Sequence, residues 1–280
     1  MKRSDRIKLD FIRNWALPGK ERLAHWLKPS AGLQQKIKDG IVWLNNEDIA
    51  IYTTADNYIE WTILSTGTYE DEINKLIRIS LKPGDNALDI GGNIGLQSIR
   101  MSKSVGNTGR VYAFEPLNHL QKKFSKNMAL NKAGNVTLFP MALSDFEGET
   151  EFSVDEHAWN QGTFSLNDKE GIHKQSVSIK IADNLTEVQA LESLALIKID
   201  VEGFEYSVLR GLAATLAKHK PRVIFEYDSN YWAKAGQSAT ECFSLLHSLN
   251  YQTYLVSSVG CELITGVEDT PSGNIFCISS

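Results

Sequence analysis

The chain has 280 residues, of which 42% are hydrophobic and 22% charged, a composition that supports a buried core and excludes a disordered or collagen-like protein. No apolar run reaches the roughly 18 residues that a membrane-spanning helix needs, and the polar N-terminus is not expected to be a secretory signal. The three cysteines form no CxxC pair, so neither a disulfide framework nor a cysteine-rich zinc site is expected.

Charge is distributed unevenly along the chain. Residues 1–38, the basic arm, contain ten lysines and arginines and three acidic residues, a net charge of +7. The chain total of −5 therefore leaves −12 for the remaining residues. Because phosphate contacts need a basic face, an acidic body argues against nucleic acid as a partner. Pro18, Gly19 and Pro29 divide the basic arm into one or two short helices.

After the basic arm, residues 40–65 alternate aromatic and β-branched residues with polar ones, which predicts short strands or a mixed cap. A helix is expected at 69–81. From residue 86 short apolar runs alternate with helical segments, which predicts a parallel sheet with helices on both faces. We expect strands at 86–90, 110–115, 135–143, 194–200, 222–226, 252–257 and 274–279, with helices at 95–105, 117–131, 204–218 and 239–249.

The first of these strands ends in a glycine-rich turn, residues 89–95 with the sequence DIGGNIG. In an open α/β sheet, ligands bind outside the carboxyl ends of the strands, and glycines let the backbone approach them closely. The second strand ends in Glu115, an acid that suits the two hydroxyls of a ribose. Together these features indicate an adenosyl cofactor.

The turn favours S-adenosylmethionine (SAM) over a dinucleotide. Asn93 stands where the second glycine of GxGxxG would be, and Asp89 would repel a pyrophosphate while attracting an amino group. SAM has an ammonium, a sulfonium and a ribose, and it carries no phosphate.

A second group of acids follows two later strands. Asp200 and Glu202 lie on one side if their strand continues that far, and Glu226 ends the neighbouring strand. Three acids around one opening should raise each other's pKa values. Such a group can bind an amine or sugar hydroxyls, hold a divalent metal, or supply a general base for a hydroxyl acceptor.

These segments resemble the FkbM-type methyltransferases, a branch of the class I, Rossmann-like SAM-dependent methyltransferases. The resemblance runs from about Gly67 to Glu226. It rests on LDIGGNIG, GRVYAFEP, ALSD and, most specifically, IKIDVEGFE at 197–205, and it departs at Gly92, where alanine is common. It implies a mostly parallel seven-stranded sheet with helices on both faces, formed by residues 66–280, and an N-terminal extension, residues 1–65.

The resemblance also implies site residues. A SAM site would comprise Glu70, Asp89, Gly91, Gly92, Asn93, Gly95, Glu115, Pro116, Ala142, Ser144 and Asp145. Acceptor contacts would come from Tyr69, Trp159, Asn160 and Glu226, the second and third in a segment that resembles the family's variable insert. Glu202, Asp200 and His157 are the candidate catalytic residues. A divalent metal stays open as an alternative, and no metal ligand is assigned.

The predicted function is a cytoplasmic SAM-dependent O-methyltransferase acting on a hydroxyl of a sugar, in a glycan or a glycolipid. Methylation of a small-molecule natural product on oxygen or nitrogen, or a non-catalytic SAM-binding module, are the alternatives. An NAD-dependent oxidoreductase is disfavoured by Asp89. The basic arm, with Phe11, Trp15 and Trp26 interleaved, could touch a membrane surface, cover the body as a solvated cap, or form a homodimer.

Overall fold

The computed structural model describes residues 3–15, 19–34, 36–37, 40–154, 159, 173–267 and 270–279. Its centre is an eight-stranded sheet in the order β12-β11-β13-β10-β9-β3-β4-β5. The strands, in chain order, are β3 (Asn86–Ile90), β4 (Arg110–Phe114), β5 (Val136–Phe139), β9 (Leu196–Ile199), β10 (Arg222–Tyr227), β11 (Tyr251–Ser257), β12 (Gly260–Leu263) and β13 (Gly273–Ser279). The five strands from β5 to β10 are parallel, whereas β13 is antiparallel to both of its neighbours.

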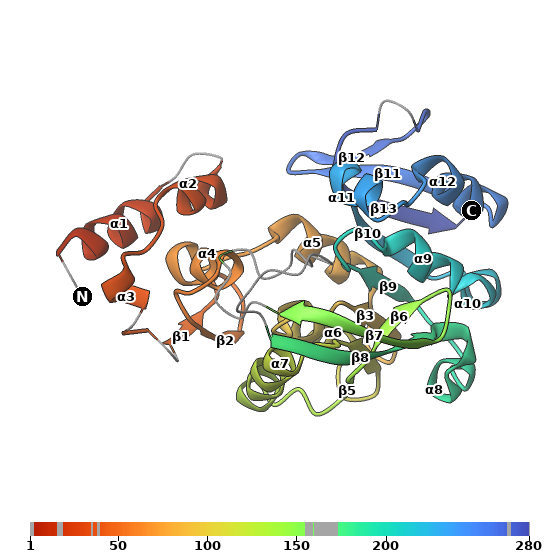
Figure 1. Ribbon diagram of the computed structural model, residues 1–280, viewed down its shortest axis with the longest axis horizontal. Helices are drawn as coiled ribbons and strands as arrows, with labels where there is room; N and C mark the ends of the chain where they lie inside the picture. The colour runs from red at the N-terminus through yellow and green to blue at the C-terminus, as the bar shows by residue number, and fades with distance from the viewer. Residues whose placement is uncertain are drawn as a thin grey trace.

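Helices cover both faces of this sheet (Figure 1). They are α5 (Asp71–Ser80), α6 (Leu96–Val105), α7 (Asn118–Leu130), α9 (Glu205–Arg210), α10 (Ala213–His219), α11 (Ser229–Lys234) and α12 (Ala239–Ser248). Successive strand residues face opposite layers. Val223 and Phe225 pack against α9 to α12, while Ile224 packs against α5 and α6. The predicted α/β class is confirmed, with eight strands rather than seven because β12 forms a hairpin with β11.

Two expected elements differ from the structure. The strand expected at 135–143 is two strands, β5 and β6 (Ala142–Ser144), separated by Pro140, which cannot donate a ladder hydrogen bond. β6 joins β8 (His173–Ile181) and β7 (Gly148–Val154) in a separate sheet, ordered β6-β8-β7. The helix expected at 204–218 is interrupted at Gly211, where a Cβ atom would lie 2.1 Å from the carbonyl oxygen of Ser144.

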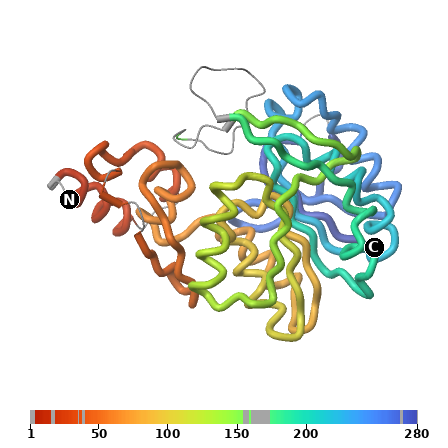
Figure 2. The backbone as a smooth tube through the Cα atoms, turned by 60° about the horizontal axis from the view of Figure 1, so that its bottom comes forward, coloured from red at the N-terminus to blue at the C-terminus, as the bar shows by residue number. Residues whose placement is uncertain are grey.

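The N-terminal lobe, the described part of residues 3–66, lies at one end of the molecule (Figures 1 and 2). It contains α1 (Arg3–Arg13), α2 (Lys20–Trp26), α3 (Ala31–Gln34), β1 (Gly40–Trp43), β2 (Ala50–Thr53) and α4 (Tyr58–Thr66). Asn57 begins α4 by accepting a hydrogen bond from the Glu60 N–H (2.9 Å). The alternation at 58–66 that suggested a strand belongs to this helix, which is buried on nearly every side and so lacks a helical period.

The N-terminal lobe is packed onto the sheet domain. The Trp61 indole N–H donates to the Ala24 carbonyl (2.8 Å), which ties α4 to α2. The Tyr52 N–H donates to the side chain of Asn127 on α7 (2.8 Å). One apolar cluster joins Ile12 of α1 to Ile94 of the glycine-rich turn. No helix in the described ranges is long and apolar enough to cross a membrane.

Candidate active site

The glycine-rich turn brings the ends of three strands together. Gly91 has φ +84°, and a Cβ atom on it would lie 1.8 Å from the carbonyl oxygen of Asp200 at the end of β9. The N–H groups of Gly91 and Gly92 both donate to the Phe114 carbonyl at the end of β4 (2.9 Å each). Only glycine fits at position 91, because the chain there has a left-handed conformation and no room for a side chain.

Asp89 lies at the centre of this arrangement and is fully buried. Its Oδ2 accepts a hydrogen bond from the Ser98 hydroxyl on α6. Its Oδ1 is also buried and has no hydrogen-bond partner among the described residues. Burial raises the pKa of this carboxyl, against the opposing effect of nearby Lys198. A buried acceptor without a partner is costly, so a ligand that donates to Oδ1 would be stabilising.

Glu115 is buried at the end of β4 and holds the turn in shape. Its two oxygens accept hydrogen bonds from the backbone N–H groups of Asn93 and Leu117 (2.9 Å each). Burial raises its pKa to about 7, despite these hydrogen bonds. Asn93 is left-handed, with φ +49°, which turns its N–H towards the carboxylate. Each carboxylate oxygen keeps a further lone pair for a ligand hydroxyl.

Lys198 is a site residue to which the sequence analysis gave no role. The parallel register places it directly opposite Asp89, so the two side chains share a face of the sheet. Its ammonium lies 2.8 Å from Asp200 Oδ2. Burial alone would lower the pKa of Lys198, but the carboxylates of Asp200, Glu70 and Asp89 outweigh burial and raise it. A lysine within the apolar run 194–199 was the signal that could have identified it.

The acidic cluster, Asp200, Glu202 and Glu226, lies at the carboxyl ends of β9 and β10. β9 ends at Ile199, and Glu202 reaches the cluster through a left-handed turn with φ +55° rather than by strand alternation. Burial, with Asp200 and Glu226 adding to it, raises the pKa of Glu202 to about 9. Burial and Asp200 raise the pKa of Glu226 to about 8. Both carboxyls therefore lose their protons at a higher pH than an exposed glutamate does.

Glu205 supports the same turn and is itself buried. Its carboxylate accepts hydrogen bonds from the N–H groups of Val201 (2.9 Å) and Gly203 (3.1 and 3.2 Å). Burial raises its pKa to about 7. Its contacts fix the loop that presents Glu202, so Glu205 is a structural residue.

The segment before α5 contacts the site from the other side. Glu70 is left-handed, with φ +52°, and its Oε2 accepts a hydrogen bond from the Gln97 amide (2.7 Å). The Tyr69 carbonyl accepts from Arg100 (2.8 Å), and burial raises the pKa of the Tyr69 hydroxyl. The Glu70 N–H donates to Glu21 of the N-terminal lobe (3.2 Å), which the sequence analysis did not associate with the site.

The remaining predicted cofactor residues lie on β6 and beside β4. Ala142 begins β6, and the Ser144 hydroxyl donates to Asp145 (3.1 Å). Asp145 also forms an ion pair with Arg210 of α9. The Pro116 carbonyl accepts from the Gln175 amide (2.7 Å). Their role in binding adenine stays a prediction.

Of the predicted acceptor and catalytic residues around 155–166, Trp159 is described, and His157 and Asn160 lie outside the described residues. The Trp159 carbonyl accepts a hydrogen bond from the Tyr58 N–H at the start of α4 (2.7 Å). The Lys28 ammonium lies 5.0 Å from the centre of the Trp159 ring. Trp159 therefore contacts the N-terminal lobe.

A family model described as the methyltransferase FkbM domain matches residues 89–253, from Asp89 through the acidic cluster into β11. The chain belongs to this family. The match covers more than half of the chain and includes both groups of residues that the sequence analysis singled out, so the predicted membership is confirmed.

Several relatives are similar to parts of this FkbM chain. The AMB antimetabolite synthetase AmbE of Pseudomonas aeruginosa is 28% identical over 61% of the chain and 10% of its own length. Methyltransferase 1 of Beauveria bassiana is 25% identical over 59% of the chain and 73% of its own length. The hexuronic acid methyltransferase AglP of Haloferax volcanii is 26% identical over 52% of the chain and 58% of its own length. The matched region thus spans less than two thirds of two of these three relatives.

Among solved structures, an FkbM methyltransferase from Methylobacillus flagellatus KT is 14% identical. That likeness covers 78% of this chain and 53% of the other, with a TM-score of 0.45.

The FkbM site fits SAM on the chain's own geometry. The partnerless Oδ1 of Asp89 suits an ammonium, and Glu115 keeps lone pairs for ribose hydroxyls. Gly91 lies against the Asp200 carbonyl and has no side chain, so no side chain of residue 91 covers the backbone of the turn. No three or more histidine, cysteine, aspartate or glutamate side chains are arranged to hold a metal ion in the part of the chain that is described.

Proposed function

We propose that the chain transfers the methyl group of SAM to a hydroxyl of a sugar, in a glycan or a glycolipid. The observation that carries this proposal is the acidic cluster at the carboxyl ends of β9 and β10, beside Asp89 and Glu115. Carboxyl groups in this number suit the hydroxyls of a sugar, which both donate and accept hydrogen bonds. The hexuronic acid methyltransferase of Haloferax volcanii, a distant relative, supports a sugar acceptor.

The cofactor would be held by three carboxyls. Asp89 would accept a hydrogen bond from the ammonium, Glu115 would accept from the ribose hydroxyls, and Glu70, fixed by Gln97, would close the methionine end. When bound, SAM supplies a methyl group that needs no further activation. The chain's contribution is therefore to align the acceptor and to take its proton.

We assign the proton transfer to Asp200 and the acceptor contacts to Glu202 and Glu226. Lys198 holds Asp200 Oδ2 at 2.8 Å, and the other oxygen is left to accept the proton of the acceptor hydroxyl. With pKa values of about 9 and about 8, Glu202 and Glu226 carry protons at neutral pH and can donate hydrogen bonds to sugar oxygens. Tyr69 and Trp159 would provide the apolar wall against which a sugar ring packs.

The acceptor is tested by incubating the protein with SAM and a panel of glycans, glycolipids, hydroxylated small molecules and amines. Mass spectrometry would then detect the gain of one methylene unit. We expect the gain on a sugar hydroxyl. A gain on amines alone or on small molecules alone would contradict the proposal, and SAM binding without any methylated product would indicate a non-catalytic module.

The roles within the cluster are tested by two substitutions at one position. Glu202→Gln keeps a neutral donor, so turnover should stay within a few-fold of the original. Glu202→Ala removes the hydrogen bond and should lower turnover by about 10- to 100-fold. Asp200→Asn, which cannot take a proton, should lower it by about 100-fold or more. If Glu202→Gln were as inactive as Asp200→Asn, Glu202 would be the base and our assignment would be wrong.

A further inference from the structure

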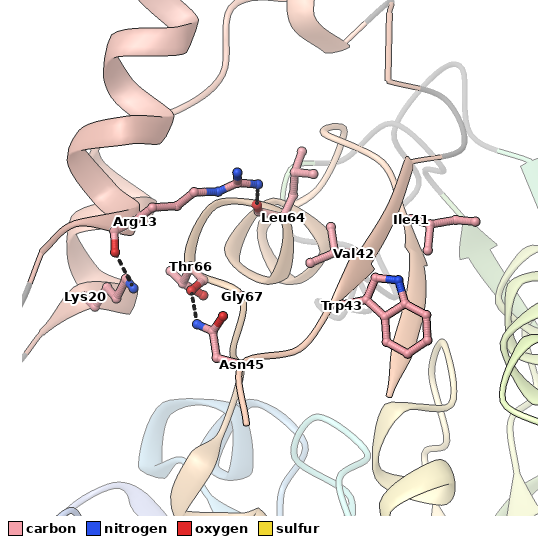
Figure 3. Close-up of a pocket in the computed structure, with 9 residues that line it drawn as sticks. All are labelled: Arg13, Lys20, Ile41, Val42, Trp43, Asn45, Leu64, Thr66 and Gly67. Atoms are coloured by element: carbon pink, nitrogen blue, oxygen red, sulfur yellow. Dashed lines mark hydrogen bonds between the residues drawn. The ribbon is translucent and has the colours of Figure 1, made fainter. Parts of the chain in front are cut away.

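A pocket of about 350 Å³ lies in the N-terminal lobe, between α1, β1 and the end of α4 (Figure 3). Arg13 and Lys20 line one side, and Ile41 and Trp43 line the other. None of the described lining residues is acidic. None of these lining residues belongs to the candidate active site, although Gly67 precedes Glu70 by three residues.

The two cations are held in place without being neutralised. The Arg13 guanidinium donates one hydrogen bond to the Leu64 carbonyl (3.2 Å), and the Lys20 ammonium donates to the Arg13 carbonyl (3.0 Å). Neither forms an ion pair with a carboxylate among the described residues. Arg13 has five N–H donors, and among the described residues one of them is used in this hydrogen bond. A guanidinium and an ammonium that line one pocket suit a phosphate.

The rim of the pocket is apolar and exposed. Ile41 and Trp43 lie on the same side of β1, with 49% and 65% of their surface exposed. The same lobe exposes Ile7, Phe11 and Trp26, so five of the ten exposed large apolar residues of the described chain lie between residues 7 and 43. Tryptophan and isoleucine around a pair of cations are typical of a surface that inserts at the boundary between lipid headgroups and acyl chains.

We propose that this pocket binds the phosphate headgroup of an anionic membrane lipid, with Trp43 and Ile41 inserted beside it. The charge of the basic arm, +7 over residues 1–38, complements an anionic leaflet. A soluble phosphate would use Arg13 and Lys20 and leave the exposed apolar rim without a role. This inference does not depend on which acceptor is methylated.

The test is co-sedimentation of the full chain with phosphatidylglycerol vesicles and, separately, with phosphatidylcholine vesicles. We expect binding to the first, weakened by salt, and little binding to the second. Arg13→Gln with Lys20→Gln should weaken binding by about 30-fold, since each cation at an anionic surface contributes roughly a factor of five. The charge-retaining pair Arg13→Lys with Lys20→Arg should bind as the original does.

A matched control removes two cations elsewhere. Lys122 is exposed on α7, and Lys218 donates to the Leu191 carbonyl (3.2 Å) much as Lys20 donates to Arg13. Lys122→Gln with Lys218→Gln should leave vesicle binding nearly unchanged. If both pairs weaken binding equally, the attraction is general and the pocket is not the site. Binding of S-adenosylhomocysteine (SAH) checks that each variant is folded. Lys20→Gln alone is also measured, because a single substitution disturbs the N-terminal lobe less than two.

Two further outcomes would also overturn the proposal. Equal binding to both kinds of vesicle would show that charge does not select the lipid. Inorganic phosphate that changes Trp43 fluorescence while the vesicles fail to bind would show a soluble-anion site in place of a membrane contact.

Discussion

The candidate active site of the sheet domain and the pocket of the N-terminal lobe use charged side chains in opposite ways. In the sheet domain Asp89, Lys198 and Glu205 are almost fully buried, and they surround one site. In the N-terminal lobe the pocket cations form no ion pair with a carboxylate of the described residues, and Trp26 exposes 85% of its surface. Buried charges are expensive unless paired, so the oxygen of Asp89 that has no partner among the described residues points to a ligand that completes the pairing. The exposed charges and rings of the lobe point to a partner surface.

The largest effect is expected at two glycines of the glycine-rich turn, which test whether contact with the end of β9 fixes the conformation of the turn. Gly91→Ala would place a methyl group 1.8 Å from a backbone oxygen at φ +84°, and it should lower the free energy of unfolding by about 3–5 kcal/mol. The nearest atom to the methyl group of Gly92→Ala belongs to the Phe124 ring, at 3.0 Å, and this change should cost less than about 1.5 kcal/mol. Urea denaturation monitored by circular dichroism measures both.

The pair is internally controlled, since the two changes add the same methyl group one residue apart. Equal losses of stability at both positions would mean that the contact between the turn and Asp200 does not determine the structure.

The next largest effect is expected at the partnerless oxygen of Asp89. Asp89→Asn removes the charge opposite the ammonium and should weaken the binding of both SAM and SAH by about 10- to 150-fold. Ser98→Ala removes only the hydroxyl that bonds to Oδ2 and leaves the carboxylate, so its effect should be much smaller. Isothermal titration calorimetry compares the two, and unchanged affinity in Asp89→Asn would place the ammonium elsewhere.

The smallest effect is expected where the N-terminal lobe contacts the site. Glu21→Ala removes the acceptor of the Glu70 N–H and should lower the free energy of unfolding by about 1 kcal/mol. Glu149→Ala, at an exposed carboxylate of β7, should have no effect and serves as the control. If Glu21→Ala matched that control, the lobe would be attached to the domain without support from this contact.

Much of the sheet domain could be predicted because its residues meet local demands of the backbone. The turn at 89–95 needs glycine at 91, and Glu115 follows β4 directly. Because the turn and Glu115 each follow a strand of one parallel sheet, their positions in the sequence were enough to predict that they lie close together. Lys198 and Glu21 were missed for a different reason. Lys198 acts through its parallel register with Asp89, and Glu21 through a contact 49 residues away, and neither relation is visible in local spacing.

The helix α4 shows the same limit within the N-terminal lobe. A helical period in the apolar residues is visible only when a helix has one buried face. Because α4 is buried on nearly every side, its apolar residues lack this period and suggested a strand. The division into residues 1–65 and 66–280 stays a prediction, although the apolar cluster that joins Ile12 to Ile94 shows that the two parts share a core.

The most direct test of a buried acidic site for a cationic cofactor is calorimetric titration with SAM and with SAH between about pH 6 and about pH 9. Glu115, Glu226 and Glu202, with pKa values of about 7, 8 and 9, lose their protons over this range. Ionised carboxylates attract the sulfonium of SAM, which SAH lacks, so the affinity for SAM relative to SAH should rise with pH. A ratio that stays constant, or binding of NAD in preference to SAM, would contradict the account.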